Sequence, residues 1–358
     1  MTGDATSENI HDGEPVPRPY APSWVDLLTG WIERLPGPSW AFYLLLWLVL
    51  SLLANAVKWL DGSLSPGAID PLLVFIVADT VYFLGLIHYL NGAADRALRA
   101  FRPALAVSED EYARLHYQLT TLPALPTLLV SGLGAAVAGL STLFNPNPPA
   151  YAASPAGIVF DAVTYIATMT FLGALLYHTV HQFTTVNRIH ATATRLNLFQ
   201  PDPLYAFSGL AIRTVVGYVV LVDVTYLFML QFMRDQASDP AVLGLFIFMV
   251  LVAVVTFVLP FLGMHGRMEE EKSRLEAEAS QRLEVAIAEL HRRIDAGDMS
   301  NFTELQRGMA ALKIEREVLE DIPTWPWEPG TLRLVITAML LPVIVWLAQR
   351  LAGQFVGL

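Results

Sequence analysis

The order of apolar and polar positions divides the chain into long hydrophobic runs separated by short polar connections. An apolar run of roughly 18 or more residues is long enough to cross a bilayer as a helix. Helices are required there because backbone polar groups must be paired without water. The pattern predicts an all-α, polytopic membrane bundle of about seven spanning helices, at residues 39–60, 71–90, 123–144, 157–183, 207–233, 241–264 and 331–352.

A charged segment separates the sixth predicted span from the seventh. Between Glu269 and Ile294 apolar residues recur at helical spacing, and a second such stripe follows Asn301. Asp295 to Asp298, with a glycine between them, break the pattern. Two helices joined by a short turn predict an antiparallel, coiled-coil-like hairpin. The positions expected to bind a partner lie on its two stripes, at Leu275, Leu283, Leu290, Leu305 and Leu312.

These elements divide the chain into four segments. Residues 1–38 are predicted to hold a disordered, acidic and proline-rich tail and one amphipathic helix with two tryptophans on its apolar face. That helix either lies in the membrane interface or packs on the bundle. The other segments are a six-helix transmembrane bundle (39–264), the hairpin (265–321), and a Trp/Pro linker with the seventh span (322–358).

The distribution of lysine and arginine predicts the orientation. Basic residues concentrate in the connections after the second, fourth and sixth spans, whereas the connection after the third span has none. Because cytosolic connections are enriched in these residues, the N-terminus is expected in the cytosol and the C-terminus outside. The preference for arginine over lysine suggests a prokaryotic gene, and therefore a multi-pass protein of the plasma (inner) membrane.

Composition excludes several classes of protein. The chain is 54% hydrophobic and only 15% charged, with a net charge of −11, and it has no basic stripe with interleaved aromatics. Nucleic-acid binding is therefore not expected. The chain has no cysteine, which excludes disulfides and thiolate metal sites. The absence of a P-loop, a dinucleotide fingerprint, an HExxH motif and a nucleophile elbow indicates a non-catalytic protein rather than an enzyme.

Acidic residues inside predicted spans are the strongest functional signal. An ionised carboxylate is costly in hydrocarbon, so such residues usually face a partner, a cavity or a transport path. Each of the three has a tyrosine one turn later, on the same helix face. The alternative is a structural role in interhelical hydrogen bonds. The candidate pathway residues are Asp79 with Tyr82, Asp161 with Tyr165, and Asp223 with Tyr226.

Histidines form a second candidate group. His88, His178, His181 and His265 all fall at the predicted cytosolic ends of spans. Imidazoles at one depth on several helices can bind zinc, copper or haem iron. Histidine also suits helix C-termini and the membrane interface, and no complete ligand set is visible. No cofactor is therefore predicted, with a metal or haem as the alternative.

Partners follow from the same patterns. The bilayer itself is the first partner expected. Small residues four apart in the third span, such as Gly134 and Ala138, allow helices to approach closely. A homo-oligomer could form through these faces or through the hairpin.

Three classes of function remain open. The first is an ion- or proton-linked channel or transporter that uses the intramembrane acids. The second is a non-catalytic sensor, scaffold or assembly factor that acts through the hairpin. The third is a membrane redox or metal-binding protein that uses the histidines.

Overall fold

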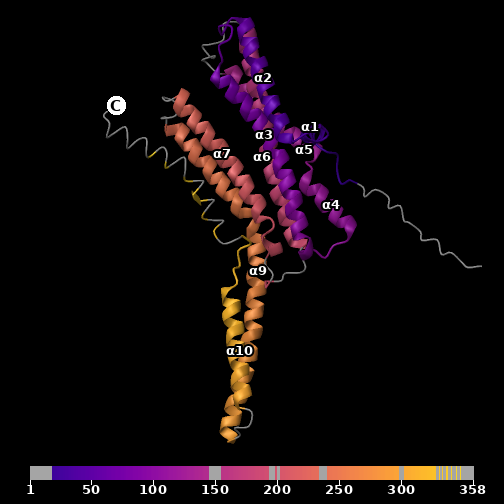
Figure 1. Cartoon of the computed structure of the whole chain (residues 1–358), viewed down its shortest axis with the longest axis vertical. Coiled ribbons are helices and arrows are strands. Elements are labelled where there is room, and N and C mark those ends of the chain that lie inside the picture. Colours follow the sequence, from indigo (N-terminus) through magenta and orange to yellow (C-terminus); the bar gives the residue numbers. More distant parts are fainter. Residues whose placement is uncertain are drawn as a thin grey trace, which may run out of the picture.

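The computed structural model describes residues 18–144, 155–192, 198–199, 202–233, 240–297 and 302–327, with isolated positions between 330 and 347. Over these residues the protein is helical and holds no β-strand (Figure 1). The α-helices are α1 (Trp24–Glu33), α2 (Ser39–Asp61), α3 (Pro71–Phe101), α4 (Glu109–Thr120), α5 (Ala124–Phe144), α6 (Pro155–Thr192), α7 (Ser208–Phe232), α9 (Pro240–Ala296) and α10 (Phe302–Asp321).

Local chemistry fixes where several helices begin and end. Asp70 precedes α3, and its carboxylate accepts hydrogen bonds from the first two free amides after Pro71. Ser108 caps α4 in the same way, through the amide of Glu111. Helix α2 ends at Gly62, whose φ of 78° lies in the left-handed region that glycine adopts without strain.

Within the described residues, five helices are long and apolar enough to cross a membrane: α2, α3, α5, α6, and α7 with the turn before it. Helices α2 and α5 leave most of their apolar side chains exposed; Leu45 and Leu133, for example, are 56% and 64% exposed. A soluble protein rarely exposes apolar surface of this extent, and lipid would cover it. An all-helical membrane protein is therefore supported.

The sixth and seventh predicted spans are not tested in the same way. Helix α9 covers the backbone of 241–264, but most side chains of this stretch lie outside the described residues. Most of 331–352 lies outside them as well.

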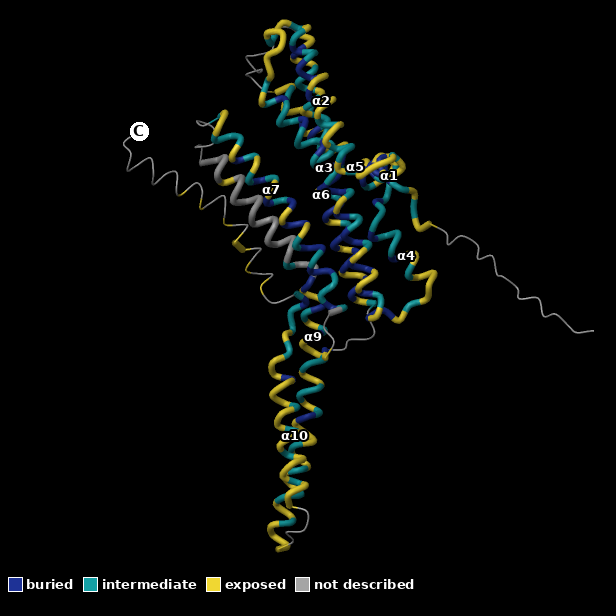
Figure 2. The backbone as a smooth tube through the Cα atoms, viewed as in Figure 1, coloured by how far each residue is buried: buried dark blue, intermediate teal, exposed yellow. Residues whose placement is uncertain are grey.

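The buried core lies where α3, α6 and α7 meet the middle of α9 (Figure 2). Ile87, Leu98 and Phe101 of α3 are fully buried there, with Leu175 of α6 and Phe261 of α9. The C-terminal end of α3 therefore lies at the base of the long extension of α9.

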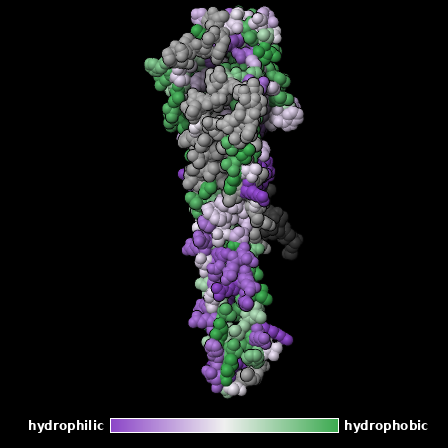
Figure 3. Space-filling view, turned by 90° about the vertical axis from the view of Figure 1, so that its left-hand side faces the viewer, coloured by the Kyte–Doolittle hydropathy of each residue, from purple (hydrophilic) through white to green (hydrophobic). Residues whose placement is uncertain are grey.

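Helix α9 continues well beyond the bundle and α10 returns along it (Figure 1). Arg282 pairs with Glu315 at 3.1 Å, and Lys272 Nζ donates to the carbonyl oxygens of Glu320 and Ile322. Earlier positions of α9 therefore contact later positions of α10, which shows that the two helices run antiparallel. We call residues 265–296 together with α10 the arm; its surface is largely hydrophilic, with hydrophobic patches towards the tip (Figure 3). Its location on the cytosolic side stays a prediction.

Helix α1 packs on the bundle, and its location in the membrane interface stays a prediction. Val25 and Ile32 are buried against the bundle, whereas Leu27 and Trp31 are 64% and 61% exposed. One face therefore packs on protein, and an adjacent apolar face is left exposed, as an interfacial helix would require.

Candidate functional site

Buried polar side chains line the face of α6 that meets α2, α3 and α7. They begin near the N-terminus of α6, where Lys58 Nζ of α2 lies 2.8 Å from Asp161 Oδ2. About two turns further on, Thr168 Oγ1 lies 2.8 Å from Thr80 Oγ1 of α3. Thr179 Oγ1 then lies 2.8 Å from the hydroxyl of Tyr218 on α7. Hydroxyl and charged groups therefore recur along the length of α6.

The line continues into the part of α6 beside the core. His178 is 1% exposed, and its Nε2 donates to Asn91 Oδ1 of α3 at 2.8 Å. This leaves Nδ1 of the neutral ring as an acceptor, and Nδ1 has no hydrogen-bond partner in the part of the chain that the structure describes. Gln182, one turn later on the same face, is 1% exposed, and neither amide atom has a partner among the described residues. Buried polar groups without partners are rare and often mark a site that binds water or ions.

Asp79 lies beside this line on the α7 side of α3. Asp79, Tyr82 and Leu86 share one helix face, since they are spaced by three and four residues. Tyr82 donates to the carbonyl oxygen of Gly217 at 2.7 Å, and Leu86 packs against Gly217. Asp79 itself makes no hydrogen bond or ion pair with any described residue.

We call this set of side chains the polar seam. Asp79 lies near Tyr82, Tyr82 lies near Tyr218, and Tyr218 meets Thr179 of α6. The buried His178 and Gln182 stand beside Thr179 on the same helix. Its members are Asp79, Thr80, Tyr82 and Asn91 of α3; Asp161, Thr168, His178, Thr179 and Gln182 of α6; Tyr218 of α7; and Lys58 of α2.

The predicted pathway acids are not brought together. Phe75 stacks on Phe228, and Tyr82 contacts Gly217, so Asp79 and Asp223 both lie between these two α3–α7 contacts. Asp223 is six residues from Gly217, however, which places it about 120° further around α7. The Oδ1 of Asp223 is buried without a hydrogen-bond partner in the described segments. The two acids share a depth but occupy different faces.

The tyrosines that follow the three acids lie in different surroundings. Tyr82 gives its proton to a backbone carbonyl rather than to Asp79. Tyr165 is 37% exposed, whereas Tyr226 is buried beside Val222. Asp161 takes its charge partner from α2, across 103 residues of sequence.

The candidate metal-binding histidines lie in separate environments. His88 lies 3.0 Å from Glu33 and 2.8 Å from the Tyr43 hydroxyl. His181 lies 2.9 Å from the carbonyl oxygen of Gln118, and His265 stacks on Trp325. Among the described residues, no three His, Asp or Glu side chains are grouped closely enough to hold a metal ion.

The predicted partner-binding leucines are half-buried in the arm. Leu275 packs against the main core, while Leu283, Leu290, Leu305 and Leu312 are intermediate in exposure. Other apolar side chains of the arm are more exposed, and these are Val285, Ile287, Ile294, Phe302, Ile314 and Val318.

Most charges of the arm are paired within it. Arg274 bonds to Glu271 and Glu278, and Arg316 bonds to Glu320. Hydrogen bonds from Arg292 and Arg293 lower the pKa of Glu289 to about 2.

The apolar outer surface and the polar seam between the helices indicate a helical membrane protein with a line of polar groups in an otherwise apolar interior. Comparison with protein-family models, with curated proteins and with solved structures gave no match. The residues themselves therefore carry the functional argument.

Proposed function

We propose that this protein is a channel or transporter that conducts protons across a membrane along the polar seam. The observation that carries the proposal is Asp79, an acid near the middle of a predicted spanning helix, without a partner among the described residues, beside a line of hydroxyl, imidazole and amide groups. Intramembrane acids of this kind mark ion pathways and proton relays.

The nature of the seam favours a proton over a metal ion. Several of its groups are paired across helices at hydrogen-bonding distance, as Tyr218 with Thr179 and His178 with Asn91 are at 2.8 Å, and a proton moves along such contacts by exchange between groups. A hydrated metal ion would need these contacts to separate. In His178, Nε2 donates a hydrogen bond to Asn91, while Nδ1 remains available as an acceptor. A ring with one donor and one acceptor nitrogen suits a proton relay.

The first experiment is a comparison of ion gradients in proteoliposomes. Purified protein is reconstituted with an internal pH-sensitive dye, and gradients of H⁺, Na⁺ and K⁺ are imposed in turn. We expect internal acidification under the proton gradient, well above that of protein-free liposomes, when a potassium ionophore compensates the charge. Rates equal to those of protein-free liposomes under every gradient would contradict the proposal.

The arm supports a second candidate function, as the contact surface of a sensor, scaffold or assembly factor. Val285 and Ile314 are 65% and 60% exposed. Most charged side chains of the arm form ion pairs with one another, as Arg274 does with Glu278 and Arg316 with Glu320. Exposed apolar residues on a projecting helix pair are typical of a surface that binds another protein. If no gradient produces uptake, this function takes precedence.

A further inference from the structure

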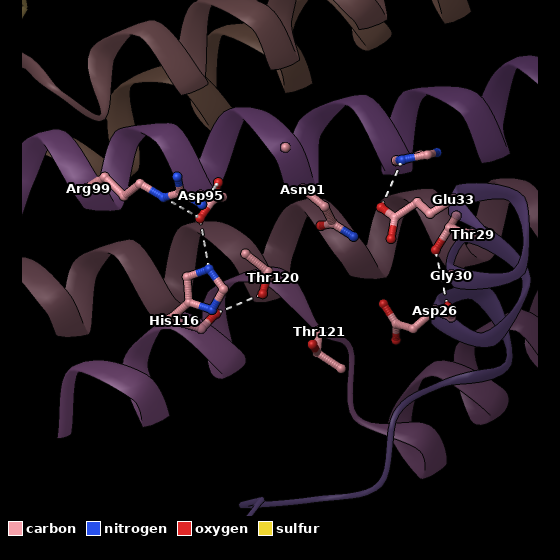
Figure 4. A pocket seen from close by; sticks show the side chains of 12 residues that line it. Asp26, Thr29, Gly30, Glu33, Asn91, Asp95, Arg99, His116, Thr120 and Thr121 are labelled. Carbon is pink, nitrogen blue, oxygen red and sulfur yellow. Dashed lines mark hydrogen bonds and ion pairs between the residues drawn. The ribbon is translucent and has the colours of Figure 1, made fainter. Parts of the chain in front are cut away.

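A polar pocket lies between α1, α3 and α4, in the C-terminal third of α3 (Figure 4). Its volume is about 440 Å³, and it is open on one side. The adjacent end of α3 packs at the base of the arm, because Phe101 belongs to the same buried cluster as Met264 and Met268. The pocket therefore lies on the arm side of the bundle.

The sequence builds this pocket from two capped helices. Ser23 and Asp26 form a capping box at the start of α1, with Ser23 Oγ 2.6 Å from Asp26 Oδ2. The same oxygen accepts the amide of Leu122 at 3.0 Å, which ties α1 to the end of α4. Burial raises the pKa of Asp26 in spite of these donors. Gly30 leaves the wall of the pocket open, because nothing lies within 4 Å of where its Cβ would be.

The charge of the pocket favours cations. Its lining contains three carboxylates, those of Asp26, Glu33 and Asp95, against one guanidinium, that of Arg99. Asp95 is satisfied by Arg99 at 2.8 Å and by His116 at 2.8 Å. Asp26 keeps one oxygen, Oδ1, without a hydrogen bond to the described residues. Glu33 uses one oxygen for His88 and is 62% exposed. Two carboxylates on one face of α1 therefore remain open to a positive charge.

The pocket also connects to the seam. Asn91 lines the pocket, and its side-chain oxygen accepts the hydrogen bond from the buried His178. His88 and His116 each sit beside a carboxylate in the same wall. One side chain, that of Asn91, is therefore common to the wall of the pocket and to the seam.

We infer that this pocket is the site at which cations, and protons above all, enter or leave the seam on the arm side, next to the buried His178. The inference rests on the proposed function and adds the location of one mouth of the path. It assigns α1 a role as one wall of that mouth.

The absence of native cysteines permits a direct test with Gly30→Cys. In proteoliposomes, the variant is treated with a methanethiosulfonate that carries either a trimethylammonium or a sulfonate group. We expect the cationic reagent to react about tenfold faster than the anionic one, because negative potential concentrates cations. Modification should then lower proton uptake to near the protein-free rate.

Gly308→Cys on the arm is the matched control, since Gly308 also has open space around it and lies far along the chain from the pocket. It should react with both reagents and keep its uptake rate. If Gly30→Cys resists both reagents, the pocket is not open to water and the inference fails. If modified Gly30→Cys still takes up protons at the unmodified rate, the mouth lies elsewhere, while the proposed function stands.

Discussion

Lys58→Met should destabilise the protein by about 3 kcal/mol or more, the usual effect of removing one partner from a buried ion pair. Lys58 is 3% exposed, and its ammonium group lies 2.8 Å from Asp161, which is 17% exposed. Methionine keeps the length of the side chain but leaves a carboxylate without its cation in a largely apolar environment. The free energy of unfolding, measured by denaturant titration in detergent micelles, gives the effect.

The double variant Lys58→Met/Asp161→Leu distinguishes the ion pair from a loss of packing. Replacing both charges by apolar groups of similar size is often neutral or stabilising. We therefore expect the double variant to recover most of the stability lost by the single variant. If the two residues act independently, the double variant loses the sum of the stability lost by Lys58→Met alone and by Asp161→Leu alone. A loss of that size would contradict the ion pair.

Gly134→Ala should destabilise the bundle by about 1–3 kcal/mol, as overpacking does in a well-packed interior. A Cβ at Gly134 would overlap the carbonyl oxygen of Met169, and one at Gly173 would lie 2.8 Å from the carbonyl oxygen of Val130. Helices α5 and α6 therefore cross at backbone contact, and neither backbone can move aside cheaply.

Gly132→Ala is the matched control for Gly134→Ala. It lies on the same helix, and nothing lies within 4 Å of where its Cβ would be. Alanine is the better helix former by roughly 1 kcal/mol, so Gly132→Ala should be neutral or stabilising. Thermal unfolding of both variants in the same detergent measures the difference, and equal midpoints would contradict the α5–α6 contact.

Apolar runs predicted the shorter membrane helices closely. The predicted 39–60 and 123–144 match Ser39–Asp61 and Ala124–Phe144, because hydrophobicity ends where these helices end. Helices α3 and α6 continue to Phe101 and Thr192, well past the predicted ends of their spans. Their later turns are amphipathic and pack on protein, so hydrophobicity alone did not reveal that they stay helical.

The candidate site was only partly predictable. Asp79, Asp161 and His178 stand out in the sequence because polar groups are rare in apolar runs. Their partners do not, because Lys58, Asn91 and Tyr218 are distant in sequence and meet them only through helix packing. Lys58 offered one signal, since it is the single basic residue in the first predicted span. Gln182 lies at the end of a span, where a polar residue attracts no notice.

The most direct test of proton conduction along the polar seam is the initial rate of proton uptake into liposomes that contain Asp79→Asn, with Asp223→Asn as the matched variant. Both substitutions remove an acid at the same depth, but only Asp79 faces the seam. Because asparagine cannot exchange a proton as a carboxyl group does, we expect Asp79→Asn to reduce the rate at least about tenfold, in line with a relay that needs an ionisable group. Asp223→Asn should retain most of it. Wild-type uptake in Asp79→Asn, with equal amounts of folded protein, would contradict a path through the seam.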